Sequence, residues 1–158
     1  MRATPRIGSF FAFLAVLVLL AGCSRGPTRQ INPPRASIQQ LQVQADGQWL
    51  LTMRLQNFSN VSTRFASVNA QLVVGGQDAG AVVLSPTLTV GPESADVLTA
   101  TLRPATGAKL VIASALAAGQ PVRYALHGKI ATAEPSGSYD FSFDSTLNPA
   151  PGLTGVMR

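Results

Sequence analysis

The residue best suited to covalent chemistry in this chain is its single cysteine, Cys23. It follows a cationic start at Arg2 and Arg6 and an apolar run over residues 7–21 that ends in small side chains. A positive start, a short apolar stretch and small residues before a cleavage point are typical of a secretory signal peptide. The sequence therefore predicts a signal peptide over residues 1–22, which leaves Cys23 at the new N-terminus.

The residues at this cleavage point resemble a bacterial lipobox, in the order Leu20, Ala21, Gly22 and Cys23. In that motif the cysteine sulfur is diacylated and the new amine is acylated. Several chains are needed because one fatty chain binds a bilayer only marginally, at about 0.8 kcal/mol per buried CH₂. We expect lipidation of Cys23, a membrane as partner and no other cofactor. The residue after the cysteine is Ser24 rather than an aspartate. By resemblance to known lipoprotein sorting, this indicates the outer membrane, facing the periplasm.

Two other interpretations of the N-terminal segment stay open. The apolar run could remain in place as a transmembrane helix, although about 15 apolar residues fall short of the roughly 20 that span a bilayer. The signal could also be cut elsewhere, which would leave Cys23 as a free thiol.

Other side chains capable of acid–base or metal chemistry are few. The only histidine, His127, shares its predicted strand face with Arg123 and Lys129, which disfavour imidazolium and supply no carboxylate to orient the ring. Asp140 and Asp144 lie on one face of a predicted strand, about 13 Å apart at the rise of a strand. That is too far to hold one metal ion without further ligands. We expect no catalytic residues and no metal site, and hence no enzyme.

The charge of the chain is basic only near its N-terminus. From residue 36 onward there are seven basic and seven acidic residues, so this part carries no net charge. Nucleic-acid binding needs a clustered basic face, and nucleic acid is therefore not expected as a partner. Arg25, Arg29 and Arg35 follow the predicted anchor. They either lie near anionic lipid headgroups or keep a linker soluble, and both roles stay open.

Alternating apolar and polar residues predict strands along most of the chain. Asp46-Gly47 between two alternating runs indicates a hairpin with a type I′ turn, and Gly75-Gly76 indicates a second hairpin. The strand before the second hairpin is expected to bury Ala66, Val68, Ala70, Leu72 and Val74. Further strands are expected over residues 95–102, 122–130 and 138–144.

One helix interrupts the predicted strands. Residues 109–118 favour a helix, with Thr106 as its N-cap and with Gly119 and Pro121 ending it. About seven short strands, each with one polar face, predict an all-β fold with one short helix, a two-sheet antiparallel β-sandwich. The expected organisation is a lipidated flexible tether over residues 23–34, the sandwich over 35–148 and a disordered tail over 149–158.

The order of several motifs is similar to a known family. The motifs are Pro34-Arg35, Leu55-Gln56-Asn57, the Gly75-Gly76 hairpin and Tyr124-x-Leu126-x-Gly128 before a Phe-rich strand. Together they resemble the water-stress and hypersensitive-response (WHy) domain of the late embryogenesis abundant (LEA) type 2 family, over residues 33–148. Phe58 stands where that family commonly has proline. The resemblance implies a fibronectin-III-like or immunoglobulin-like sandwich without catalysis, an association with desiccation and stress protection, and lipid handling in some relatives.

Three aromatic residues are candidates for a contact patch. Trp49 opens a predicted strand, where it either packs in the core or lines a crevice, and Phe58 and Phe65 flank a polar loop that either contacts a partner or closes the sandwich. The leading hypothesis is a non-enzymatic envelope lipoprotein with a stress-protective or binding role. The alternatives are an accessory subunit of an envelope transport or secretion complex, with an envelope protein as partner, and a lipid-binding module.

Overall fold

The computed structural model describes Gly26 and residues 28–158. The predicted signal peptide, the lipobox and Cys23 lie outside the described residues. Within those residues, no helix has the length and hydropathy needed to cross a bilayer.

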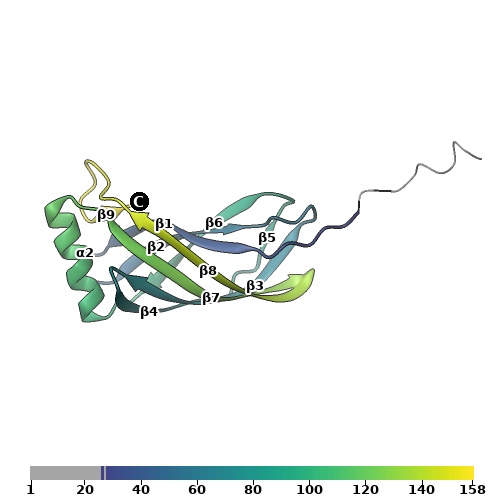
Figure 1. The fold of residues 1–158 in the computed structure, drawn as a ribbon, viewed down its shortest axis with the longest axis horizontal. Helices are drawn as coiled ribbons and strands as arrows, with labels where there is room; N and C mark the ends of the chain where they lie inside the picture. Colours follow the sequence, from purple (N-terminus) through teal and green to yellow (C-terminus); the bar gives the residue numbers. More distant parts are fainter. Residues whose placement is uncertain (1–25, 27) are drawn as a thin grey trace, which may run out of the picture.

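The described residues form two antiparallel sheets and one helix (Figure 1), which confirms the predicted all-β sandwich. The first sheet has the order β6-β2-β1-β9. The second has the order β4-β3-β7-β8, with β5 also paired to β3. The elements are β1 (Arg35–Val43), β2 (Trp49–Gln56), β3 (Thr63–Val74), β4 (Gln77–Leu84), β5 (Leu88–Val90), β6 (Ala95–Leu102), α2 (Thr106–Ala118), β7 (Val122–Glu134), β8 (Ser136–Leu147) and β9 (Val156–Met157).

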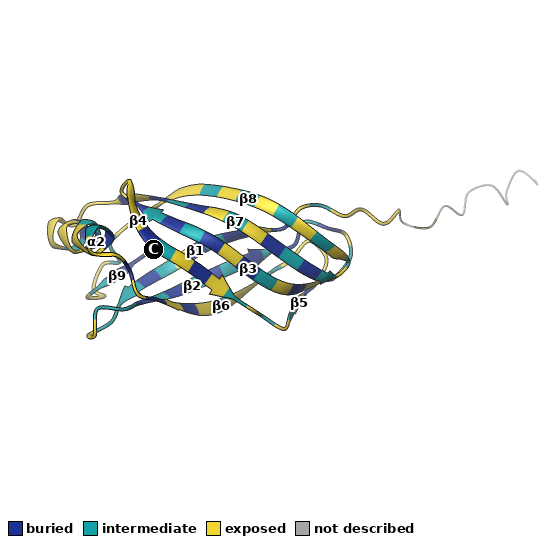
Figure 2. Ribbon diagram, turned by 90° about the horizontal axis from the view of Figure 1, so that it is seen from below, coloured by how far each residue is buried: buried dark blue, intermediate teal, exposed yellow. Residues whose placement is uncertain are grey.

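Alternation along the strands places the core between the sheets, and Figure 2 shows buried and exposed residues alternating along them. Within two strands, β-bulges reverse the face of the sheet to which the apolar residues of the alternation point. In β1 the buried side chains change from Ile38 to Leu41 across an irregularity in the pairing with β2. In β3 a similar irregularity buries Phe65 and exposes Ala66, so the expected inward position of Ala66 is wrong. An extra residue in one strand reverses which face the following side chains take.

The two predicted hairpins differ in their turns. Gly75 and Gly76 both have positive φ, +55° and +78°, between Val74 and its partner Gln77. This agrees with the two-residue turn expected there. At Asp46-Gly47 only the glycine has positive φ, and Gln44 closes the loop by accepting from the Gly47 N–H and donating to the Gln48 carbonyl. The loop is therefore longer than a type I′ turn, and that prediction is wrong.

Helix α2 starts and ends close to the predicted bounds. Its N-cap is Ala105, in an extended conformation and without a side-chain hydrogen bond, so the expected N-cap at Thr106 is wrong. Gly119 ends the helix with φ +65°, as expected, and its N–H donates to the carbonyls of Ala115 and Leu116. The helix buries Ala108, Ile112 and Ala115 against the end of the sandwich.

The C-terminal segment is ordered, contrary to the predicted disordered tail over residues 149–158. Strand β9 adds to the edge of β1, with Met157 opposite Leu41 and Val156 opposite Gln42. Met157 is fully buried and Val156 is nearly so. Pairing with the free edge of β1 and the burial of two apolar side chains offset the conformational entropy that is lost when this short segment becomes ordered.

The long axis of the molecule separates two ends (Figure 1). At one end lie helix α2, the β1–β2 loop and the β3–β4 turn. Contact between α2 and this turn is close, since a Cβ on Gly75 would lie 2.6 Å from Val111 Cγ1. At the other end the N-terminal segment enters β1, next to the loop that follows β2. We call these the helix end and the entry end.

Candidate functional site

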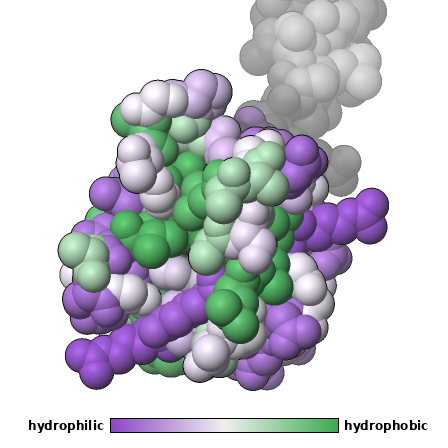
Figure 3. Space-filling view, turned by 90° about the vertical axis from the view of Figure 1, so that its left-hand side faces the viewer, coloured by the Kyte–Doolittle hydropathy of each residue, from purple (hydrophilic) through white to green (hydrophobic). Residues whose placement is uncertain are grey.

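The helix end contains an apolar hollow of about 480 Å³, between the β1–β2 loop, helix α2 and the loop before β9. Its apolar wall includes Val43, Trp49, Ile112 and Leu116. These residues come from segments far apart in the sequence. We call this cavity the helix-end hollow. In Figure 3, which faces this end, hydrophobic residues lie together at the surface beside hydrophilic ones.

The polar residues that line the helix-end hollow are Gln44, Lys109 and Thr154. The Gln44 Nε2 is buried and has no hydrogen-bond partner among the described residues. Lys109 also lines an adjoining polar hollow of about 360 Å³ with Arg103 and Asp46. Its Nζ extends over the β1–β2 loop, 3.6 Å from the point where a Cβ on Gly47 would lie. The apolar cavity therefore opens beside a site with two cations and one carboxylate.

The Asp46 carboxylate is engaged within its own loop. It accepts hydrogen bonds from the Gln48 backbone N–H at 3.0 Å and from Gln48 Nε2 at 2.5 Å. The backbone hydrogen bond, then the side-chain one, holds the pKa of Asp46 below its usual value, with a further contribution from Arg103. Within residues 28–158, neither Arg103 nor Lys109 forms an ion pair. The adjoining hollow thus keeps a net positive charge at neutral pH.

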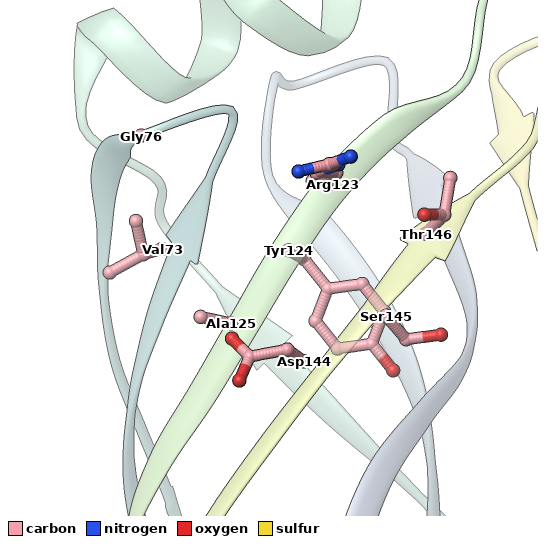
Figure 4. A pocket seen from close by; sticks show the side chains of 8 residues that line it. All are labelled: Val73, Gly76, Arg123, Tyr124, Ala125, Asp144, Ser145 and Thr146. Carbon is pink, nitrogen blue, oxygen red and sulfur yellow. The ribbon is translucent and has the colours of Figure 1, made fainter.

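A second cavity, of about 510 Å³, lies along β7 and β8 next to the β3–β4 turn. Figure 4 shows its side chains spread along the strands rather than converging on one point. Arg123 and Asp144 line it without forming an ion pair with each other. Tyr124 turns its hydroxyl inward, where it accepts from the Ile38 N–H at 3.2 Å and donates to the Ile38 carbonyl at 3.3 Å. This cavity has no arrangement of groups suited to acid–base chemistry.

The entry end is organised by the side chain of Asn57, which is buried. Its Nδ2 donates to the carbonyls of Val61 at 2.7 Å and Gly91 at 2.8 Å. Its Oδ1 accepts from the Ser59 N–H at 2.9 Å and from Thr63 Oγ1 at 3.0 Å. One asparagine therefore connects the loop after β2 with the turn before β6.

The same loop binds the N-terminal segment. Asn60 donates to the Thr28 carbonyl and accepts from the Gln30 N–H, both at 2.8 Å. Asn32 donates to Ser59 Oγ at 3.0 Å and to the Phe58 carbonyl at 2.8 Å. The predicted flexible tether is therefore wrong for residues 28–32, which are fixed by hydrogen bonds to the loop.

The three residues of the predicted contact patch do not form one exposed surface. Trp49 and Phe65 are buried, with 1% and 0% of their surface exposed, so neither presents a side chain on the outer surface. Trp49 also lines the helix-end hollow, so it both packs in the core and lines a cavity. Phe58 is half-buried under the Arg35 guanidinium, which lies 5.2 Å from the ring centroid and 5.6 Å from that of Phe143. These distances are those of cation–π contacts.

The other candidate residues lie on the outer face of the second sheet. His127 is exposed and pairs in register with Ser142 and Gln71. Asp140 forms an exposed ion pair with Lys129 at 3.4 Å, and Asp144 lies at the second cavity. Among the described residues, no group of three or more His, Cys, Asp or Glu side chains could hold a metal ion.

A crevice at Trp49 is one of the two alternatives that the sequence leaves open, but the rest of the helix-end hollow is not predicted from the sequence. Its residues belong to three segments without a shared motif. The available signals were a tryptophan at the start of a strand and a helix that is apolar almost all round, both of which are also typical of core packing.

Comparisons with family models and with curated proteins find no match. Solved structures match this chain at low identity. A protein from Archaeoglobus fulgidus is 16% identical, with 77% of this chain and 98% of that chain covered and a TM-score of 0.44. A protein from Arabidopsis thaliana is 12% identical, with 76% and 78% covered and a TM-score of 0.47. A "putative late embryogenesis abundant (LEA) protein" is 12% identical, with 92% and 88% covered and a TM-score of 0.49.

Proposed function

We propose that this chain is a non-enzymatic lipoprotein of the cell envelope whose sandwich acts as a stress-protective or binding module of the LEA type 2 kind. Cys23 carries the lipid, and the outer membrane, facing the periplasm, is the proposed location. The lipobox-like residues and the order of the family-like motifs support this proposal. The observation that carries it is the separation of the two ends of the domain.

This separation gives an anchored domain a defined orientation. Residues 28–32 are bound to the loop after β2, so only the residues between Cys23 and Thr28 are available to reach the bilayer. The five Cα-to-Cα steps from Cys23 to Thr28 span at most about 17 Å when fully extended. The entry end would then face the headgroups closely, and the helix end with its hollow would face away from the membrane.

The anchor is tested with Cys23→Ser and with Ser24→Ala as a matched control. We expect Cys23→Ser to leave the membrane fraction and to incorporate no labelled palmitate, while Ser24→Ala behaves as the wild type. Equal membrane association and equal palmitate incorporation by Cys23→Ser would refute lipid anchoring.

The protective role is tested in a strain that lacks the gene. We expect reduced survival after osmotic or drying stress, restored by the wild-type gene and not by Cys23→Ser. Unchanged survival of the deletion strain would contradict a protective role and leave binding as the function.

A second candidate is an accessory subunit of an envelope transport or secretion complex. It is favoured by apolar side chains exposed at the helix end, Leu110 at 63% and Leu153 at 47%. Crosslinking in cells followed by purification should then recover one envelope protein in a fixed ratio. Recovery without a stoichiometric partner would contradict this candidate.

A further inference from the structure

The helix-end hollow combines features of a small-molecule site. Its volume of about 480 Å³ lies within the roughly 300–1,000 Å³ typical of ligand cavities. Such cavities are mostly apolar, with a few polar groups that fix the orientation of the ligand. Here Val43, Ala113 and Leu116 provide accessible apolar surface, while Trp49 and Ile112 are packed behind it with 1% of their surface exposed. The polar lining residues are Gln44, Lys109 and Thr154.

We infer that the helix-end hollow binds an amphiphile with a single carboxylate head and an apolar body, the chemistry of a free fatty acid. This inference deepens the binding role in the proposed function and is independent of the lipid on Cys23. The apolar body would lie against Val43 and the Leu116 side of the helix, and the carboxylate would lie toward Lys109.

The Gln44 side chain favours a ligand with a hydrogen-bond acceptor. Its Nε2 is buried without a partner in the described part of the chain, although buried polar groups are nearly always hydrogen-bonded. Gln44 also lines the hollow, so a rotation of its side chain would bring Nε2 to a carboxylate oxygen bound there. A pure hydrocarbon would leave the amide unpaired, and the structure therefore favours an oxygen-bearing ligand.

The charges at the mouth favour an anionic head. Lys109 lines both the apolar hollow and the adjoining polar one, to which Arg103 and Asp46 also contribute. The Asp46 carboxylate offsets one of the two cations and is already hydrogen-bonded to Gln48. The remaining net charge of one positive unit matches a monoanion, whereas a cationic head would be repelled at close range.

The test uses the lipidated full chain in zwitterionic nanodiscs, photolabelled with a diazirine derivative of dodecanoic acid. We expect saturable labelling of peptides that contain residues 43–49 or 109–116, competed by dodecanoate and not by methyl dodecanoate. The methyl ester has the same chain without the charge, so it controls for partition into the bilayer. Labelling spread over the chain, labelling only near the anchor, or equal competition by the ester would overturn the inference.

Two substitutions probe the head and the body of the ligand. Lys109→Gln, at an exposed position, should weaken dodecanoate binding by about fivefold, the scale of an exposed ion pair. Leu116→Trp should fill the hollow and abolish saturable labelling. Lys129→Gln and Leu110→Trp are matched controls outside the hollow and should change neither. Unchanged binding in Lys109→Gln would overturn the assigned carboxylate position.

Gln44→Leu separates ligand recognition from a structural role. Replacing an unpaired buried amide with an apolar group should leave the unliganded protein equally stable or more stable, while dodecanoate binding weakens. A loss of stability without a change in binding would overturn the role assigned to Gln44. Failure of these binding tests, with the membrane and stress phenotypes of the Cys23 experiments intact, would reject only this inference.

Discussion

Substitution of Asn57 by alanine tests the polar network that organises the entry end. The side chain makes four hydrogen bonds of 3.0 Å or less, to Val61, Gly91, Ser59 and Thr63. Each is worth about 0.5–1.5 kcal/mol net, and buried groups left unpaired cost about 1–3 kcal/mol. The hydrogen bonds to the two carbonyls are only partly buried, so part of this loss is offset by hydration. We expect Asn57→Ala to lower the free energy of unfolding by about 3 kcal/mol.

This loss is a large share of the roughly 5–15 kcal/mol by which native domains are stable. Urea unfolding can be followed by the fluorescence of Trp49, the only tryptophan, which is buried at the opposite end of the sandwich. At a slope of about 1.5–2 kcal/mol/M, the midpoint should fall by about 1.5–2 M. Equal slopes in both proteins would show that the change lies in stability.

The matched control for this substitution is Asn69→Ala, on the exposed face of β3. Exposed substitutions away from special features usually stay within about 0.5 kcal/mol. A difference between the two variants of less than about 1 kcal/mol would refute the assignment of Asn57 as the residue that connects the entry-end loops.

Three further substitutions test other contacts, each by urea unfolding. Gly128→Ala should cost about 2–3 kcal/mol or prevent folding, because its Cβ would lie 2.1 Å from the backbone oxygen of Asn69; wild-type stability would contradict this close approach. Tyr124→Phe should cost about 1–2 kcal/mol by unpairing the Ile38 backbone. Desolvation raises the pKa of Tyr124, so stability present below about pH 10 should fall as pH rises further, a component absent from the variant; parallel pH profiles would argue against it. Met157→Ala should cost about 2–4 kcal/mol, since Met157 is fully buried, whereas a disordered tail predicts no change.

Alternation and turn residues are sufficient to predict the sandwich because both are local properties of the sequence. Gly75-Gly76 supplies two positive φ values next to alternating runs, and the observed hairpin follows. Bulges are harder to predict, because the alternation is regular on each side of them. Only the face of the sheet to which the buried residues point changes from one side of the bulge to the other. The exposure of Ala66 beside the buried Phe65 results from such a change in β3.

The C-terminal strand and the hydrogen-bonded N-terminal segment depend on partners distant in sequence. Val156 and Met157 are too few to give a periodic signal, and the surrounding Gly and Pro residues are typical of disorder. Their order comes from the open edge of β1, more than a hundred residues earlier in the chain. Residues 28–32 similarly gain their structure from the side chains of Ser59 and Asn60.

The helix-end hollow as a whole could not be predicted for the same reason, although two of its three segments could be. The sequence predicted the strand at Trp49 and a largely apolar helix, but not that a loop next to β9 would complete the cavity wall. The family-like motif with Asn57 acquires a physical role that its pattern did not indicate. Its amide orders the loop that holds residues 28–32.

The two ends of the domain satisfy their polar groups in different ways, and this difference bears on function. At the entry end, the buried Asn57 side chain is hydrogen-bonded to the neighbouring loops through both its amide nitrogen and its amide oxygen, which fixes those loops. At the helix end, the buried Gln44 amide is unpaired and Lys109 forms no ion pair within the described residues. Hydrogen-bonding capacity left unused beside an apolar cavity is available to a ligand. A domain held to the membrane by its entry end would present that capacity to the compartment it faces.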